Sequence, residues 1–235
     1  MNLLFLDTET TGNDVAQDRL CQVCYKNTEG IHVGYFKPPI PMSVKSMSIT
    51  HITNKMLEDK ESFQESQMKK DLEELFKESV FVAHNAKFDI AILEAEGMTI
   101  PKHICTLRVA RALDSDDVIP EYNLQFLRYY LDLEVEGNAH DAEGDVLVLE
   151  AVFQRLFAKL REMVASDDEA IEKMIEISRT PSLFTKFNFG KHKDKKIADA
   201  LISDRGYLEW LLKQKLEAGD NDEDWIYTLQ TYLKK

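Results

Sequence analysis

The sequence predicts an α/β fold in which helices flank a mixed β-sheet and a small C-terminal module follows. Short apolar segments near the N-terminus have the length and pattern of buried strands. Downstream, strand-like segments alternate with segments whose apolar residues recur at a helical period, as in layered α/β domains. Beyond the proline-containing break at 179–181, aromatic residues gather again, which predicts a second and smaller core.

The first strand-like segments form a meander. These segments are 2–6, 19–26 and 31–37. Residues 27–30, between the second and the third, have the composition of a hairpin turn. The proline-rich stretch 38–41 ends the meander and leads into a loop and a short helix at 49–57.

Helices and further strands follow in alternation. The segments with a helical apolar period are 63–77, 88–96, 123–131 and 141–160. Residues 80–83 and 104–106 are strand-like, and the second segment leads directly into a helix that ends at Leu113. Crossovers of this kind add parallel strands to the meander, so the sheet is expected to be mixed.

The length of 235 residues suits one good-sized domain and a small second one. With 44% hydrophobic and 30% charged residues, the chain is expected to be globular. We predict a main domain over residues 1–165, a polar linker over 166–180 and a C-terminal module over 181–235. Five side chains of the module are expected to form a core of their own. They are Phe187, Phe189, Tyr207, Trp210 and Leu211.

Neither a signal peptide nor a membrane span is expected, because the apolar run at 3–6 is interrupted at Asp7 and no basic stretch precedes it. Three cysteines, an odd number, fit a reducing cytoplasm better than a disulfide scaffold. Cys21 and Cys24 have the spacing of a metal-binding pair. On a strand, however, these two side chains point to opposite faces, so buried cysteines are expected instead of a zinc site.

Charge is distributed unevenly along the chain. The net charge of −13 argues at first against a nucleic-acid partner. From 180 to 215, however, eight Lys or Arg stand against four acids, so this stretch carries +4 and the remainder −17. Five lysines of the stretch are candidates for contact with DNA, and a solvated surface is the alternative. They are Lys186, Lys191, Lys193, Lys195 and Lys196.

Four acids and one histidine mark a candidate metal site. Asp7 and Glu9 lie two residues apart at the predicted end of the first strand, so both side chains leave one face. Asp89 lies in the first turn of a later helix, while His140 precedes the last helix of the main domain and Asp145 lies early in it. Ligand sites of α/β sheets gather at such junctions.

Acids packed together out of water need a neutralising charge. Four carboxylates suit two Mg²⁺ or Mn²⁺ ions, which prefer oxygen ligands. Two such ions can stabilise the attacking and the leaving oxygen of a phosphoryl displacement. A histidine can take a proton from water near neutral pH. The alternative is that these acids are ordinary surface carboxylates.

Three motifs resemble those of a known family. DTETTG at 7–12, HNAKFD at 84–89 and the spacing of His140 and Asp145 are similar to the motifs of the DEDDh 3′→5′ exonucleases. The resemblance covers about 1–160 and implies a ribonuclease-H-like fold. The tail, from RTPSLFTKFNFGKHKDKK to RGYLEWLL, resembles the C-terminal extension of one bacterial branch of that family.

The resemblance implies a hydrolase that releases nucleoside 5′-monophosphates from the 3′ ends of DNA, single-stranded or duplex, in DNA repair. The implied metal ligands are Asp7, Glu9, Asp89 and Asp145. Asp7 would bridge two divalent cations, and His140 would be the general base. Asp141 is expected to cap the helix rather than to bind metal, because Asp is favoured at a helix N-terminus.

The resemblance also implies contacts to the terminal nucleotide. They are Thr8, Thr10, Thr11, Met47 and His51. His84 and Asn85 are further candidates, and the alternative is that they only shape the strand-to-helix turn. The chain departs from the family at Gln22, where relatives often have an acid, so one secondary contact is in doubt.

Three other functions stay open. A proofreading subunit of a replicative polymerase shares the fold but needs a polymerase-binding tail. An RNA-trimming enzyme differs in the sugar that it accepts. A non-catalytic module that binds nucleic acid would have lost one or more of the acids, and all four are present.

Overall fold

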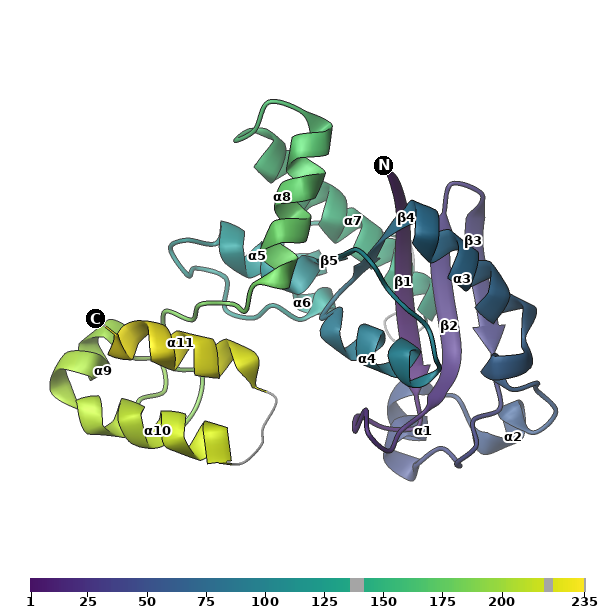
Figure 1. Ribbon diagram of the computed structural model, residues 1–235, viewed down its shortest axis with the longest axis horizontal. Coiled ribbons are helices and arrows are strands. Elements are labelled where there is room, and N and C mark those ends of the chain that lie inside the picture. Colours follow the sequence, from purple (N-terminus) through teal and green to yellow (C-terminus); the bar gives the residue numbers. More distant parts are fainter. Residues whose placement is uncertain (136–141, 218–221, 235) are drawn as a thin grey trace. The chain divides into compact units, whose positions relative to one another are not determined.

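The computed structural model of the protein describes residues 1–135, 142–217 and 222–234. The chain forms two compact units (Figure 1). The main unit comprises Met1–Leu113 and Ile119–Ser178, and the small unit comprises Asp114–Val118 and Arg179–Lys235. Within the described ranges, no helix is long and apolar enough to cross a membrane.

The main unit is built on a five-stranded mixed sheet, which confirms the predicted fold class (Figure 1). The strands are β1 (Asn2–Thr10), β2 (Leu20–Asn27), β3 (Gly30–Tyr35), β4 (Ser79–Ala83) and β5 (His103–Cys105). They lie in the order β3-β2-β1-β4-β5. β1, β4 and β5 are parallel, whereas β2 is antiparallel to both β1 and β3.

Helices cover both faces of this sheet (Figure 1). They are α1 (Val44–Thr50), α2 (Asn54–Leu57), the 3₁₀ helix η1 (Phe63–Glu65), α3 (Gln67–Glu78), α4 (Lys87–Ala95), α5 (Thr106–Leu113), α6 (Leu124–Tyr130), α7 (Ala142–Arg161) and α8 (Asp167–Arg179). One face packs on α5 to α8 in a core that contains Phe5 and Phe153. The other face packs on α3 and α4 around Leu4 and Phe81. Because Leu4 and Phe5 enter different cores, the first strand is apolar at successive positions.

Residues 167–179 form helix α8 and not the predicted linker. The buried side chains of α8 recur at a helical period and belong to the core of the main unit. They are Ala170, Ile171, Met174 and Ile175. The acidic stretch that suggested a linker is the first turn of this helix, where negative charge is favourable.

Strand β1 extends to Thr10, beyond its predicted end at Leu6. Pairing with β4 stops at Phe5, but antiparallel pairing with β2 continues past Glu9, with a bulge before Thr10. Asp7 and Glu9 therefore lie within the strand, on a part that has lost its parallel neighbour. The single helix predicted at 49–57 is also wrong, because a left-handed residue at His51 ends α1 before α2 begins.

The small unit contains three helices among its described residues. They are α9 (Ile197–Ser203), α10 (Arg205–Glu217) and α11 (Glu223–Leu233). Phe187, Leu211 and Trp225 are buried at the centre of its core, with Phe189 and Tyr207 packed against them. This confirms that the tail has a core of its own.

Phe187 and Phe189 lie on an irregular stretch, where the described pairing is one antiparallel bridge between Lys186 and Lys196. The expectation that Trp210 belongs to the core is wrong. Trp210 is 53% exposed, because Leu211 faces the core from the same helix in its place.

Candidate active site

Three carboxylates converge on the sheet face that α7 covers. Asp7 and Glu9 follow Phe5 at every second position of β1 and so share its face, and Asp145 lies in the first turn of α7. One oxygen of each carboxylate lies within 4.8 Å of the other two. The edge-to-face packing of Phe5 against Phe153, with ring centroids 5.3 Å apart, holds β1 and α7 together next to the acids.

Asp89 approaches from α4 and is 4% exposed. Its Oδ1 accepts hydrogen bonds from the backbone N of Thr8 at 3.1 Å and from the hydroxyl of Thr8 at 2.7 Å. Because Thr8 stands between Asp7 and Glu9 on β1, these bonds fix Asp89 beside the other acids. The motifs HNAKFD and DTETTG therefore meet directly.

Burial and like charge raise the pKa of these acids. The pKa of Asp7 is well above its ordinary value because of burial, and next because of the charges of Asp89, Glu9 and Asp145. Burial, followed by the charges of Asp145 and Asp89, raises the pKa of Glu9 to about 7. Burial also raises the pKa of Asp89, although the hydrogen bonds from Thr8 oppose this shift. The cluster therefore favours bound protons or a bound cation.

Two glutamines adjoin the acids. The side-chain Nε2 of Gln125 on α6 donates to Oδ1 of Asp145 at 2.6 Å. Gln22 on β2 is buried and is the cross-strand partner of Glu9, so the position that lacks the family's acid lies directly beside the cluster. Gln125 was missed in the sequence, since it belongs to none of the motifs.

The threonines of the first motif are buried and make local hydrogen bonds. The hydroxyl of Thr10 donates to the backbone oxygen of Gly12 at 2.5 Å, and that of Thr11 donates to Oδ1 of Asp18 at 2.8 Å. These bonds fix the backbone that follows β1. Thr8, Thr10 and Thr11 thus hold the end of β1 in shape through their side chains.

Ser46 joins α1 to the first motif. Its hydroxyl donates to the backbone oxygen of Thr11 at 2.7 Å. Met47, the next residue of α1, is partly buried, and His51 is exposed at the end of the helix. The segment that contains Met47 and His51 is therefore tied to the end of β1 by a residue that the sequence did not single out.

His84 has both ring nitrogens within hydrogen-bond distance of other residues. Nδ1 lies 2.9 Å from the hydroxyl of Thr106, and Nε2 lies 2.7 Å from the backbone oxygen of Tyr122. Burial lowers the pKa of His84 to about 4, so the ring is neutral at pH 7. Asn85 has a left-handed backbone, with φ of 60°. These observations favour the alternative that both residues shape the turn between β4 and α4.

His140 and Asp141 lie outside the described residues. The predictions that His140 is the general base and that Asp141 caps α7 remain predictions.

Cys21, Cys24 and Cys105 are buried thiols outside any disulfide among the described residues, and they belong to different cores. Cys21 packs with Met42, and Cys24 lies in the core on the α7 side of the sheet. Burial, and then the charge of Glu9, raises the pKa of Cys21 to about 12, so its thiol stays protonated. This arrangement agrees with the prediction that Cys21 and Cys24 cannot hold one metal ion together.

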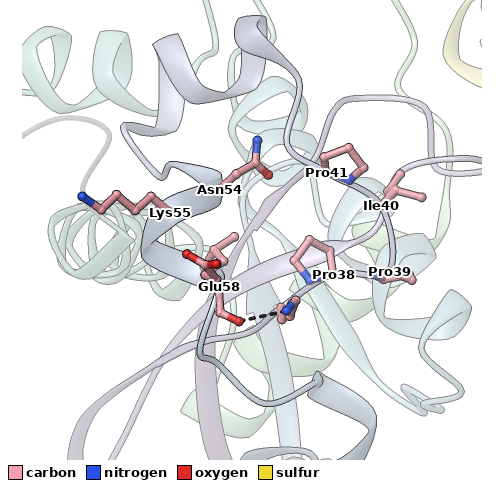
Figure 2. Close-up of a pocket in the computed structure, with 9 residues that line it drawn as sticks. Pro38, Pro39, Ile40, Pro41, Asn54, Lys55 and Glu58 are labelled. Carbon is pink, nitrogen blue, oxygen red and sulfur yellow. Dashed lines mark hydrogen bonds between the residues drawn. The ribbon is translucent and has the colours of Figure 1, made fainter.

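A pocket of about 560 Å³ lies elsewhere on the main unit (Figure 2). Prolines 38, 39 and 41, together with Ile40, form one side of it, and Asn54, Lys55 and Glu58 form another. The Nζ of Lys37 donates to the backbone oxygen of Glu58 at 2.9 Å across it. Among the residues of the described chain that line this pocket, none belongs to the acid cluster.

Comparison with known proteins identifies the class. The family model described as Exonuclease matches residues 4–153, so the chain belongs to the exonuclease family. A second model, described as Exodeoxyribonuclease X-like C-terminal, matches residues 187–215. The chain is therefore a nuclease of the hydrolase class, and the tail resemblance noted in the sequence is to the exonuclease X branch.

Among curated relatives, Exodeoxyribonuclease 10 of Escherichia coli K12 is 30% identical over 180 residues, covering 74% of this chain and 73% of the relative. The DNA polymerase III subunit epsilon of Treponema pallidum is 31% identical over 163 residues, covering 65% of this chain and 74% of the relative. Both similarities span most of the main unit.

Solved structures give the same fold. A structure of Exonuclease X in complex with 5′ overhanging duplex DNA matches with a TM-score of 0.57 and 25% identity, covering 75% of this chain and 99% of that one. Exonuclease I of E. coli in complex with a dT13 oligonucleotide matches with a TM-score of 0.55 and 22% identity, covering 69% of this chain and 42% of that one. The ribonuclease-H-like fold is thereby confirmed.

Proposed function

We propose that this exonuclease removes nucleotides from the 3′ ends of DNA and releases nucleoside 5′-monophosphates, using two divalent cations. The observation that carries the proposal is the convergence of Asp7, Glu9 and Asp145 within 4.8 Å, with Asp89 fixed beside them by Thr8. In an exonuclease, such a cluster can hold the divalent cations that assist phosphodiester hydrolysis.

The donor set fits Mg²⁺ or Mn²⁺. Carboxylate oxygens are hard ligands that these ions prefer. Burial, and then repulsion among the acids, raises the pKa values of Asp7 and Glu9, and a bound cation offsets both effects. The proposed ligands are Asp7, Glu9, Asp89 and Asp145. When bound, two divalent cations supply the charge that stabilises the attacking and the leaving oxygen.

The chain's own residues supply orientation and proton transfer. Asp7 would be the ligand shared by both ions, because the charges of Asp89, Glu9 and Asp145 all act on its carboxyl group. Thr8 and Gln125 orient Asp89 and Asp145 through their hydrogen bonds. His140 is proposed as the general base that accepts a proton from the attacking water near neutral pH.

The terminal nucleotide is proposed to bind against the backbone of Thr8, Thr10 and Thr11, with Met47 and His51 as side-chain contacts. The hydroxyls of the three threonines bond Asp89, Gly12 and Asp18, so these side chains shape the end of β1 against which the nucleotide is proposed to lie. The Ser46 bond to Thr11 supports a place for α1 at this site. His84 and Asn85 are proposed to position the turn and not to contact DNA.

DNA is the proposed substrate and DNA repair the proposed role. The exonuclease X and exonuclease I structures are complexes with DNA, and the C-terminal model that matches is that of exonuclease X. The same match makes a proofreading subunit the weaker alternative, although a polymerase epsilon subunit is comparably identical. The buried cysteines, which are thiols and not disulfides, support a cytoplasmic location.

The decisive experiment compares matched 3′-labelled and 5′-labelled DNA with Mg²⁺ and with chelator. We expect the 3′ label to be released at once as a mononucleotide, and the 5′ label to shorten stepwise. Chelator should stop both reactions. Activity that persists in chelator would contradict the metal proposal, and preferential degradation of RNA of the same sequence would contradict the DNA proposal.

A further inference from the structure

The small unit exposes one of its two tryptophans. Trp225 is 3% exposed, within the core, whereas Trp210 on α10 is 53% exposed. The ring of Trp210 lies next to that of Tyr207, with centroids 5.6 Å apart. The indole of Trp210 is more exposed than any other described aromatic ring of the small unit, and it is available for contact with a flat apolar partner.

A chain of contacts connects Trp210 to the lysine-rich turn 190–196. The hydroxyl of Tyr207 lies so close to Gly190 that a Cβ at Gly190 would stand 2.6 Å from it. The ring of Tyr207 also lies 4.8 Å from that of buried His192. Tyr207 thus packs against both the start of the turn and Trp210, which places the exposed indole beside the turn.

Some of the lysines in and next to this turn form ion pairs with acids, and others do not. The Nζ of Lys191 lies 2.7 Å from Asp204, and that of Lys186, before the turn, lies 3.2 Å from Asp117. Three further lysines are exposed and, within the described part of the chain, have no ion-pair partner. They are Lys193, Lys195 and Lys196.

Two acids lie among or just after these three cations in the sequence. They are Asp194 within the turn and Asp199 in the first turn of α9. Glu209, next to Trp210 in sequence, is neutralised by Arg205, with Nε 3.0 Å from its carboxylate. The surface is therefore positive, in a protein whose net charge is −13. Such a local reversal of sign selects a polyanion over a typical protein partner.

We propose that the surface formed by Trp210, Lys193, Lys195 and Lys196, here called the Trp210 surface, binds single-stranded DNA. One base stacks on the indole of Trp210, and the lysines contact neighbouring phosphates. Aromatic rings beside a basic track are the usual means of holding single strands without sequence preference. That the nucleic acid is DNA rests on the proposed function. The stacking on Trp210 and the attraction of phosphates to the lysines do not depend on that function.

The test uses the full chain and a fluorescein-labelled dT20 in chelator, so that binding is measured without hydrolysis. Trp210→Ala should raise the Kd about tenfold, the usual effect of losing one stacked base. Replacing Lys193, Lys195 and Lys196 by Ala should lower the slope of log Kd against log salt concentration by about 2. On blunt duplex DNA, Trp210→Ala should have a much smaller effect, because paired bases cannot stack on the ring.

Matched variants control for folding and for charge. Trp210→Phe keeps an aromatic ring and should retain most of the affinity for dT20. Alanine at Lys77, Lys159 and Lys173, exposed lysines of the main unit that each pair with a glutamate three residues away, removes the same charge. This control should leave the salt slope nearly unchanged. Binding of dT20 should also quench the tryptophan fluorescence of the unsubstituted protein. Trp210→Phe should remove most of that quenching.

An unchanged Kd for dT20 in Trp210→Ala, with an unchanged salt slope in the lysine variant, would overturn the proposal. So would a parent dimer that Trp210→Ala dissociates without any effect on DNA, because the surface would then bind a second copy of the chain. Hydrolysis of a p-nitrophenyl ester of thymidine 5′-monophosphate by the parent with Mn²⁺ tests the proposed function separately. If the ester is hydrolysed but the Kd values do not change, only the Trp210 proposal fails.

Discussion

At the scale of single residues, the acid cluster combines burial with like charge. Asp7 lies among Glu9, Asp89 and Asp145, and each of them raises its pKa. Thr8 and Gln125 donate hydrogen bonds to two of these acids and hold them in place. Substitutions here can therefore separate the effect of charge from that of orientation.

Asp7→Asn removes the charge at the centre of the cluster. We expect turnover on DNA to fall by at least about 10³-fold, because several kcal/mol of transition-state stabilisation depend on the bound cations. Calorimetric titration with Mn²⁺ should show weaker binding. Asp71→Asn, which changes an exposed acid of α3, is the control and should leave both quantities unchanged. Normal turnover in Asp7→Asn would remove Asp7 from the metal site.

His140→Ala tests the proposed base. The rate should fall by about 10²–10⁴-fold, the usual contribution of a positioned acid–base group. The affinity for Mn²⁺ should be spared, since the acids are intact. A full rate near neutral pH would show that another group accepts the proton.

Gln125→Leu tests orientation without changing charge. Without the 2.6 Å bond to Asp145, the concentration of Mg²⁺ needed for half-maximal activity should rise by about 10–100-fold, as for other residues that orient a metal ligand. Gln64→Leu is a matched control, because Gln64 also donates to a buried carboxylate, that of Glu96, outside the cluster. Equal effects of the two substitutions would point to a general loss of stability.

At the scale of helices and strands, the elements with a clear local pattern of apolar residues were the ones predicted from the sequence. The first part of strand β1 was predicted from its continuous apolar run, and the amphipathic α3 from its helical period. Helix α8 was not, because its acidic first turn resembles a linker. At the site, Asp7 and Asp89 were predicted to be neighbours from motifs. Gln125 was not, because its contact depends on how α6 packs against α7 and not on any local pattern.

Met174→Ala tests whether α8 belongs to the main core. Met174 is fully buried there, so its truncation should lower the free energy of unfolding by about 2–5 kcal/mol. Lys173→Ala, at an exposed neighbouring position, should change it by less than about 0.5 kcal/mol. Urea unfolding of both variants measures the difference. A negligible effect of Met174→Ala would return residues 167–179 to the status of a linker.

At the scale of the whole molecule, the acid cluster makes metal-free stability depend on pH. Unfolded Asp and Glu titrate near 4, whereas the folded pKa of Glu9 is about 7 and those of Asp7 and Asp89 are raised. Between these values the folded chain binds more protons than the unfolded chain. Stability from these groups is therefore complete below about pH 4 and is lost as the pH rises through about 7.

In chelator, the melting temperature should fall between pH 5.5 and pH 8, and Mg²⁺ should restore it at pH 8. Glu9→Gln should melt higher than the parent at pH 8 in chelator, because one repelling charge is gone. Thermal unfolding followed by circular dichroism measures all of these values. Identical melting of parent and Glu9→Gln at pH 8 would show that the acids do not destabilise the metal-free fold.

The small unit is discontinuous in the chain, since Asp114–Val118 belongs to it together with the C-terminal stretch. Within it, Asp117 accepts a hydrogen bond from Thr185 at 2.6 Å and pairs with Lys186. A single protease cleavage or a stop codon after α8 would consequently separate Asp117 from both partners. A gene fusion or domain swap that uses the small unit should therefore include both stretches, because the C-terminal stretch alone lacks Asp117 and is expected to be less stable.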